Sequence, residues 1–70
     1  MANKDLNKLK VVLADKKRTN KWLAEQLSKD QTTISKWCTN TSQPDLASLM
    51  KISELLEVDL TELVRFDNKV

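Results

Sequence analysis

Residues 19–37 read TNKWLAEQLSKDQTTISKW, and this stretch decides the fold. Its first half predicts a short helix capped by Thr19 or Asn20, and its second half predicts another that begins after Asp30 and ends at about residue 38. Residues 28–30 form the tight break between them. Apolar side chains recur at helical spacing on both segments and predict one shared inner face: Leu23, Ala24, Leu27, Ile34 and Trp37.

Three further helices are predicted around this pair. The first begins at Asp5, the fourth opens at residues 44–45, and the fifth is capped by Asp59. A polar loop, residues 39–44, precedes the fourth helix. Asn40 is its natural left-handed residue because the chain has no glycine. Helices of about 8–12 residues cannot bury their apolar faces alone, so the sequence predicts an all-α fold, a small five-helix bundle.

The predicted core is shared by all five helices. We expect residues 1–70 to form one domain with its folded core at about 5–66. The predicted core residues are Leu9, Val12, Leu13, Leu23, Ala24, Leu27, Ile34, Trp37, Leu49, Ile52, Leu56, Leu60 and Leu63, and the same apolar stripes also include Leu6, Leu46, Met50 and Val64.

The composition argues against an enzyme. The chain has no His, which removes the common general base and any His-containing metal site, and no Gly, which removes glycine-rich phosphate loops. The one cysteine, Cys38, makes neither an internal disulfide nor a Cys-rich zinc site. We therefore expect no metal and no cofactor, and a reduced, cytoplasmic environment. No apolar run approaches the ~18 residues of a membrane span, so no membrane association is expected.

The charge is divided unevenly along the chain. Residues 1–36 carry nine Lys or Arg and four acidic residues, a net charge of +5, whereas residues 37–70 carry three basic and six acidic residues, a net charge of −3. A basic half beside an acidic half fits a protein with one face toward a polyanion. A chance division of solvated surface charge explains the same numbers, so charge alone does not decide the function.

Two short helices joined by a tight turn, at about residues 19–38, form the helix-turn-helix pattern, whose second helix enters the DNA major groove. The order and spacing of several residues are specific to this pattern: Thr19, Leu23, Ala24, Leu27, Ile34, Ser35, Lys36, Trp37 and Pro44, followed by Leu49, Leu56, Leu60 and Leu63. On these residues the chain resembles the Cro/repressor-type (Xre-like) helix-turn-helix proteins of phages and bacteria, from about Leu6 to Val64. The resemblance implies a lambda-repressor-like DNA-binding domain and double-stranded DNA as the partner.

The chain departs from the family pattern at several positions. Asn20 stands where the family usually has Gln, and Ser28 stands where it usually has Gly in the turn. Many members pair an Arg in the first helix with a Glu after the recognition helix, whereas this chain has Leu13 and Cys38 there. An apolar pair avoids an unpaired buried charge, so we interpret Cys38 as a core residue rather than a redox sensor.

The solvent side of the predicted helix that begins after Asp30, the recognition helix of this pattern, carries the candidate DNA contacts. Amide, hydroxyl and ammonium groups there match the hydrogen-bonding edges of bases in the major groove. The candidate base-contacting residues are Gln31, Thr32, Thr33 and Lys36, which the resemblance also indicates. The candidate phosphate-contacting residues, at the start of the preceding helix and along and after the recognition helix, are Thr19, Asn20, Lys21, Ser35, Thr39, Asn40 and Thr41. Solvated polar side chains and simple helix capping are the alternative interpretation.

The expected function is a sequence-specific transcriptional regulator, a repressor or controller-type protein, that acts as a homodimer on a two-fold symmetric operator. Its dimer contact is predicted at Leu60, Val64 and Phe66 near the C-terminus. No small-molecule effector is expected, because no second domain is evident. The alternative is an antitoxin or adaptor module of the same fold that binds a protein. Trp22 is interpreted as a partly exposed packing residue, with a DNA-backbone or partner contact left open.

Overall fold

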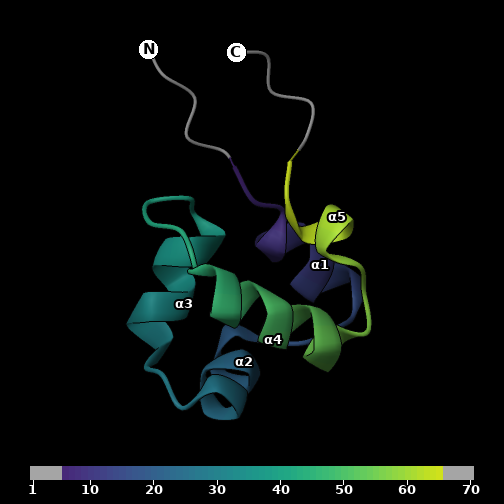
Figure 1. Ribbon diagram of the computed structural model, residues 1–70. Helices are drawn as coiled ribbons and strands as arrows, with labels where there is room; N and C mark the ends of the chain where they lie inside the picture. The colour runs from purple at the N-terminus through teal and green to yellow at the C-terminus, as the bar shows by residue number, and fades with distance from the viewer. Residues whose placement is uncertain (1–5, 66–70) are drawn as a thin grey trace.

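The computed structural model describes residues 6–65, and this part of the chain folds into five helices without strands (Figure 1). The helices are α1 (Leu9–Asp15), α2 (Asn20–Leu27), α3 (Gln31–Cys38), α4 (Leu46–Leu56) and α5 (Leu60–Leu63). The predicted all-α, five-helix fold is confirmed. The lengths differ from expectation at the two ends of the chain, because α1 has 7 residues and α5 is a single turn of 4.

The helices pack around one apolar cluster. α2 and α3 contact each other most extensively, α4 covers α2 and α5, and α1 lies against α3 and α5 (Figure 1). The buried members of the cluster are Leu9, Val12, Leu13, Leu23, Ala24, Ile34, Trp37, Ile52, Leu56 and Leu63. All ten were predicted, and the other three predicted core residues, Leu27, Leu49 and Leu60, are partly buried against the cluster.

Side-chain caps set the starts of the helices. Thr19 accepts a hydrogen bond from the Trp22 N–H (3.0 Å), Asp30 from the Thr33 N–H (3.1 Å) and Asp45 from the Ser48 N–H (2.9 Å). Asp59 begins α5 in a capping box, in which Glu62 accepts from the Asp59 N–H. Each cap binds an N–H group that has no partner within its own helix. These caps confirm the predicted boundaries.

Residues in the left-handed conformation lie at or just after the C-terminal ends of several helices. Lys17, Ser28, Asn40 and Glu57 have φ between 55° and 60°. Glycine usually takes such positions, and an L-residue there costs roughly 1–2 kcal/mol. Asn40 was predicted in this role and is confirmed. Ser28 ends α2 and turns the chain toward α3, with the Lys29 N–H bonded to the Ala24 carbonyl (2.9 Å).

The chain before α1 is extended, which corrects the prediction that Leu6 belongs to the first helix. The Lys8 N–H donates to the Leu63 carbonyl (2.8 Å), and the Arg65 N–H donates to the Leu6 carbonyl (2.9 Å), around an antiparallel bridge between Asn7 and Val64. Leu6 is exposed rather than part of the apolar stripe. The predicted cap, Asp5, lies outside the described residues. The bridge also takes Val64 out of the fifth helix.

Among residues 6–65, Asn7 is the polar residue that is buried, with 5% of its surface exposed. Its amide nitrogen donates to the Trp37 carbonyl (3.0 Å) and to the Gln43 side chain (2.7 Å), and its amide oxygen accepts from the Leu9 N–H (3.0 Å) at the start of α1. Asn40 completes the arrangement from the other side. Its side-chain oxygen accepts from the Asn7 N–H (3.0 Å), and its amide nitrogen donates to the Asn7 carbonyl (3.2 Å).

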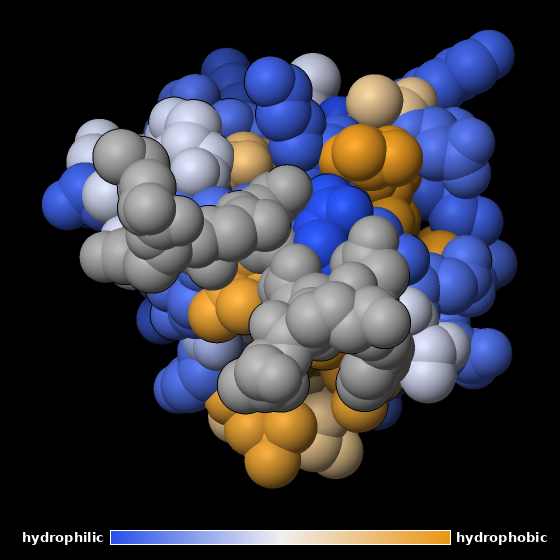
Figure 2. All heavy atoms as spheres, turned by 90° about the horizontal axis from the view of Figure 1, so that it is seen from above, coloured by the Kyte–Doolittle hydropathy of each residue, from blue (hydrophilic) through white to orange (hydrophobic). Residues whose placement is uncertain are grey.

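The predicted apolar stripe of α4 is wider than the surface it covers. Leu46 and Met50 are 67% and 51% exposed, whereas Ile52 and Leu56 on the opposite face are buried. The molecule is small, with extents of 34 × 23 × 22 Å. The 11-residue α4 therefore packs one face against the core, and its other face stays in solvent. Seen from the end where the described chain starts and stops, apolar side chains form separate areas between polar ones (Figure 2). Among residues 6–65, no helix has the length and apolar character that a bilayer-spanning segment needs.

Replacing Asn7 by Ala tests how much the buried amide stabilises the fold. The change leaves the Leu9 N–H and the Trp37 carbonyl without their side-chain partner in the interior. We expect the free energy of unfolding to fall by about 1–3 kcal/mol, measured by urea denaturation. The control Gln43→Ala removes a partly buried bond with Asn7 and an exposed bond with Asn40, and since neither is fully buried its loss should be smaller. Equal losses in the two variants would contradict this account.

The caps of α3 and α4 predict a fall in stability in acid. Hydrogen bonds from the Thr33 hydroxyl and N–H lower the pKa of Asp30 below its ordinary value of 3.8, and hydrogen bonds from Ser48 lower the pKa of Asp45 in the same way. Folding therefore favours the ionised carboxylates. Their stabilisation is present above pH 3.8 and is lost as the pH falls through the lower folded pKa values.

The measurement is the melting temperature of the protein between pH 2 and 5, a range of about three units around the carboxyl pKa. We expect the double variant Asp30→Asn/Asp45→Asn to keep its caps and to lose less melting temperature on acidification than the wild type, since Asn caps a helix without titrating. Glu25→Gln, an exposed change outside the caps, is the control. If the double variant lost as much melting temperature on acidification as the wild type, the caps would not be the cause of the acid sensitivity.

Candidate nucleic-acid interface

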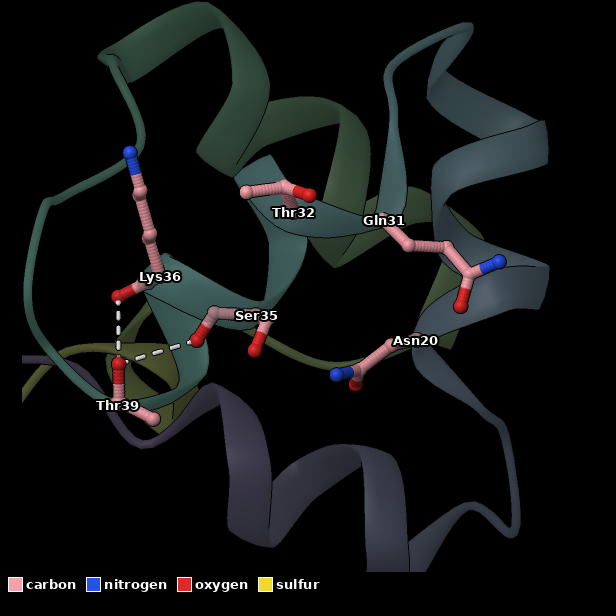
Figure 3. A pocket seen from close by; sticks show the side chains of 6 residues that line it. All are labelled: Asn20, Gln31, Thr32, Ser35, Lys36 and Thr39. Carbon is pink, nitrogen blue, oxygen red and sulfur yellow. Dashed lines mark hydrogen bonds between the residues drawn. The ribbon is translucent and has the colours of Figure 1, made fainter.

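The solvent face of α3 forms a shallow depression with a volume of about 350 Å³. Because Ile34 and Trp37 are buried, the helix is fixed in rotation and presents its polar side outward. Six side chains line the depression, and all six were predicted DNA contacts: Asn20, Gln31, Thr32, Ser35, Lys36 and Thr39 (Figure 3). The structure thus brings together one residue from the start of α2 and five from α3 and the residue after it.

The polar groups follow one another along the helix. Gln31 and Thr32 lie in the first turn of α3, and Lys36 extends from the last turn (Figure 3). A glutamine amide both donates and accepts, as the adenine edge requires, and an ammonium donates to the guanine edge or to phosphate. This order places the amide and hydroxyl groups at the start of α3 and a cation at its end.

Asn20 is oriented by Cys38. The Cys38 thiol donates to the Asn20 side-chain oxygen (3.5 Å), which leaves the amide N–H groups of Asn20 as donors at the depression. Burial raises the pKa of the Cys38 thiol, and the nearby charge of Lys10 offsets this only in part, so the thiol is protonated and able to donate at neutral pH. Cys38 packs against the core, as its sequence position suggested.

Asn20 and Gln31 face the same depression, and no hydrogen bond between their side chains is present in this described region (Figure 3). Asn20, which stands where the resemblance implies a Gln, is bonded to Cys38 instead of Gln31.

The other predicted contacts lie outside this depression. The Thr33 hydroxyl donates to Asp30 (2.7 Å) and so belongs to the α3 cap, and the Asn40 amide holds the Asn7 backbone. The Thr41 hydroxyl bonds that of Thr39 (2.8 Å), which in turn donates to the Ser35 and Lys36 carbonyls (Figure 3). Lys21 is exposed on α2. These side chains, Lys21 apart, support the loops and turns around α3.

A second depression of about 350 Å³ adjoins the first and shares Asn20, Ser35 and Thr39 with it. It lies between α1 and the α2–α3 pair and is also lined by Lys10, Leu13, Ala14, Arg18, Thr19 and Cys38. Lys10 and Arg18 were not among the predicted contacts. Arg18 directly precedes Thr19 in the sequence, whereas only the packing of α1 against α3 places Lys10 in the same lining as Thr39.

The combined surface is cationic. Lys10, Arg18 and Lys36 line the two depressions, and the lining contains no Asp or Glu side chain. The nearest acid along α3 is its cap, Asp30, whose carboxylate is occupied by Thr33. Three of the nine basic residues of the first half of the sequence therefore line this face. Among residues 6–65, no three His, Cys, Asp or Glu side chains gather in a way that could hold a metal ion.

The predicted dimer residues are used within the protomer where they are described. Leu60 is partly buried against the core, and Val64 pairs with Asn7 in the bridge. Phe66 lies outside the described residues. Trp22 is also partly buried against the core, as interpreted from the sequence, and the Arg18 guanidinium lies over its ring, 4.7 Å from the centroid.

Comparison with known proteins agrees with this geometry. The Cro/C1-type HTH DNA-binding domain matches residues 8–69. The chain is also similar to a crystal structure described as "a putative DNA-binding protein from Bacteroides fragilis", with 58% identity and a TM-score of 0.84 over 86% of this chain and 97% of that one. No curated protein matches. The chain therefore belongs to the Cro/C1-type helix-turn-helix DNA-binding family.

Proposed function

We propose that this protein is a transcriptional regulator that recognises a specific sequence in double-stranded DNA. The observation that carries the proposal is the acid-free polar surface of α3, which joins Gln31, Thr32 and Lys36 to the donor groups of Asn20. Such a surface offers base-edge contacts in its centre and phosphate contacts at its margin, and both are needed for sequence-specific binding.

The proposed docking places α3 in the major groove with its first turn toward the base edges. Gln31 bonds an adenine in two places, Thr32 offers its hydroxyl or its methyl group, and Lys36 bonds a guanine or a phosphate one turn further along. Asn20 and Lys21, at the start of α2, bind backbone phosphates together with Thr19. The hydroxyls of Ser35 and Thr39 lie between these two sets of contacts.

The first test selects bound sequences from a random duplex pool and measures binding of the winner. Gln31→Ala and Lys36→Ala should each weaken binding to the selected duplex by about 1–3 kcal/mol and relax the preference at one base position. Asn20→Ala should weaken binding to all sequences alike. Fluorescence anisotropy with the selected duplex and single-base variants gives these values.

Two matched controls lie outside both depressions. Gln26→Ala and Lys16→Ala remove an exposed amide and an exposed cation of the same kinds and should leave the base preference unchanged. An unchanged preference in Gln31→Ala would show that α3 docks in another register. A wild-type protein that enriches no sequence, and whose weak binding is equal for every duplex, would favour the antitoxin or adaptor function.

We further propose that two copies bind a two-fold symmetric operator, because one eight-residue recognition helix covers only a short half-site. The second copy is expected at α4, where Leu46 and Met50 form an exposed apolar pair one turn apart. Lys51 and Glu54, both exposed, flank the pair. In an antiparallel two-fold contact the same patch meets itself, so the Lys of each copy can face the Glu of the other.

Met50→Glu tests this contact. We expect the variant to bind a single half-site like the wild type and to lose cooperative binding to the full operator, because a carboxylate on each copy would be buried against its equivalent. Val11→Glu, at an exposed apolar position on α1, is the control and should keep cooperativity. Sedimentation of the protein–DNA complexes counts the copies, and two copies on the full operator with Met50→Glu would exclude α4 as the interface.

A further inference from the structure

The described chain begins and ends at the same end of the molecule, beside the loop that follows α3 (Figure 1). We call the hydrogen bonds that join Leu6 and Asn7 to Trp37, Asn40 and Gln43 the junction. Within it, the Asn40 side-chain oxygen accepts from the Leu6 N–H (2.8 Å) and from the Asn7 N–H (3.0 Å). The Asn7 side chain donates to the Trp37 carbonyl (3.0 Å). The junction therefore links the start of the described chain to the last turn of α3.

The loop that contains Asn40 also contacts the backbone of Lys36. The Lys36 carbonyl accepts from the Thr41 N–H (2.9 Å) and the Ser42 N–H (3.3 Å). The Thr39 hydroxyl donates to the same carbonyl (3.3 Å). Lys36 and Thr39 both line the depression on the solvent face of α3. A movement of this loop would therefore displace two members of the candidate interface.

The junction lies where the fold is least protected from solvent. Two backbone bonds support it from the other side, from the Lys8 N–H to the Leu63 carbonyl and from the Arg65 N–H to the Leu6 carbonyl. Leu6 is 46% exposed, and its bond to Asn40 is exposed to solvent. Exposed hydrogen bonds with few apolar contacts open at a lower free energy than the core does. We expect the junction to open locally while the rest of the fold stays intact.

We propose that DNA binding requires the closed junction, and that Asn7 and Asn40 are positioning residues that act through the loop on Lys36 and Thr39. The inference rests on the proposed function, since DNA is the ligand of that surface. In the open state the Trp37 carbonyl loses its bond from Asn7, and the loop loses its contact with the chain start. The end of α3 then has no fixed position against DNA. Closure and binding stabilise each other, because coupling between two equilibria is reciprocal.

Amide hydrogen exchange of the full chain tests this coupling. It is measured with and without a duplex that carries one half-site of the selected sequence, so that a second copy plays no part. The N–H groups of Leu6, Asn7 and Arg65 report opening of the junction. At a duplex concentration about 100 times the Kd, exchange through an open state that does not bind DNA slows by up to about 100-fold.

The internal control is the Val58 N–H, which donates to the Ser53 carbonyl (3.0 Å) at the end of α4. Its local opening leaves α3 unchanged, so DNA should not alter its exchange rate. The comparison uses N–H groups that exchange faster than those of the core, since such exchange does not require global unfolding. A general stabilisation of the fold by DNA would not separate the junction from Val58.

Two variants open the junction without changing a candidate base-contacting side chain. Asn40→Gly keeps the left-handed backbone, which glycine adopts readily, and removes the side-chain bonds with Leu6 and Asn7. Asn7→Ala removes the bond to the Trp37 carbonyl. Each should weaken half-site binding by about five- to tenfold in fluorescence anisotropy. The double variant should bind no more weakly than the weaker-binding single variant, because both changes act on one junction.

Glu57→Gly is the matched control variant. It places glycine at another left-handed position, at the end of α4, and should keep the wild-type affinity. Melting temperatures are measured for every variant, and affinities are compared at a temperature where all of them are folded. A loss of affinity then reports the DNA-facing surface and not the amount of folded protein.

Three results would overturn the proposal. The first is unchanged exchange of the Leu6, Asn7 and Arg65 N–H groups when DNA binds. The second is wild-type affinity in Asn40→Gly, and the third is full additivity in the double variant. A wild-type protein that enriches no duplex sequence would remove the proposed function and the coupling together. Sequence-specific binding with unchanged exchange at the junction would remove the coupling alone.

Discussion

The fold depends on one buried amide. Asn7 joins the start of α1 to the end of α3 and to the following loop, while the backbone on either side of it pairs with the end of α5. These bonds lie inside the protein, where an unpaired polar group costs far more than the bond itself contributes. Asn40 can close this arrangement only in its left-handed conformation after α3. The position of α1 relative to α3 is therefore set by hydrogen bonds, with apolar packing filling the space between them.

The two depressions at α3 follow from this constraint. The second depression exists because α1 lies against α3, and it places Lys10 and Arg18 beside side chains that belong to the helix-turn-helix pair. The polar face of α3 itself depends on the contact between α2 and α3, which are neighbours in the sequence. Buried Leu23, Ala24 and Ile34 fix the rotation of both helices there. Local packing thus orients the polar side chains of α3, and the longer-range polar contacts add the cations around them.

Sequence alone predicts the features whose causes are local. The caps at Asp30, Asp45 and Asp59 each act within three residues, and helical spacing identified the whole buried core. The prediction of where α1 starts was wrong because Asn7 is hydrogen-bonded to residues that lie 30 and 36 positions further along the chain. The exposure of Leu46 and Met50 was missed because an apolar stripe does not reveal how much surface its helix covers. Lys10 joined the candidate site only through tertiary packing, and no spacing rule links it to Thr39.

The left-handed residues at the helix ends have a further consequence for the denatured protein. A chain without glycine has fewer backbone conformations when it is unfolded, so it loses less conformational entropy on folding than a chain with flexible glycine hinges. In the folded state, the same lack of glycine places four other residues in the left-handed conformation, and their strain offsets part of this entropic advantage. Part of the stability of this small domain therefore arises from restriction of its disordered state, where no contact seen in the folded molecule exists.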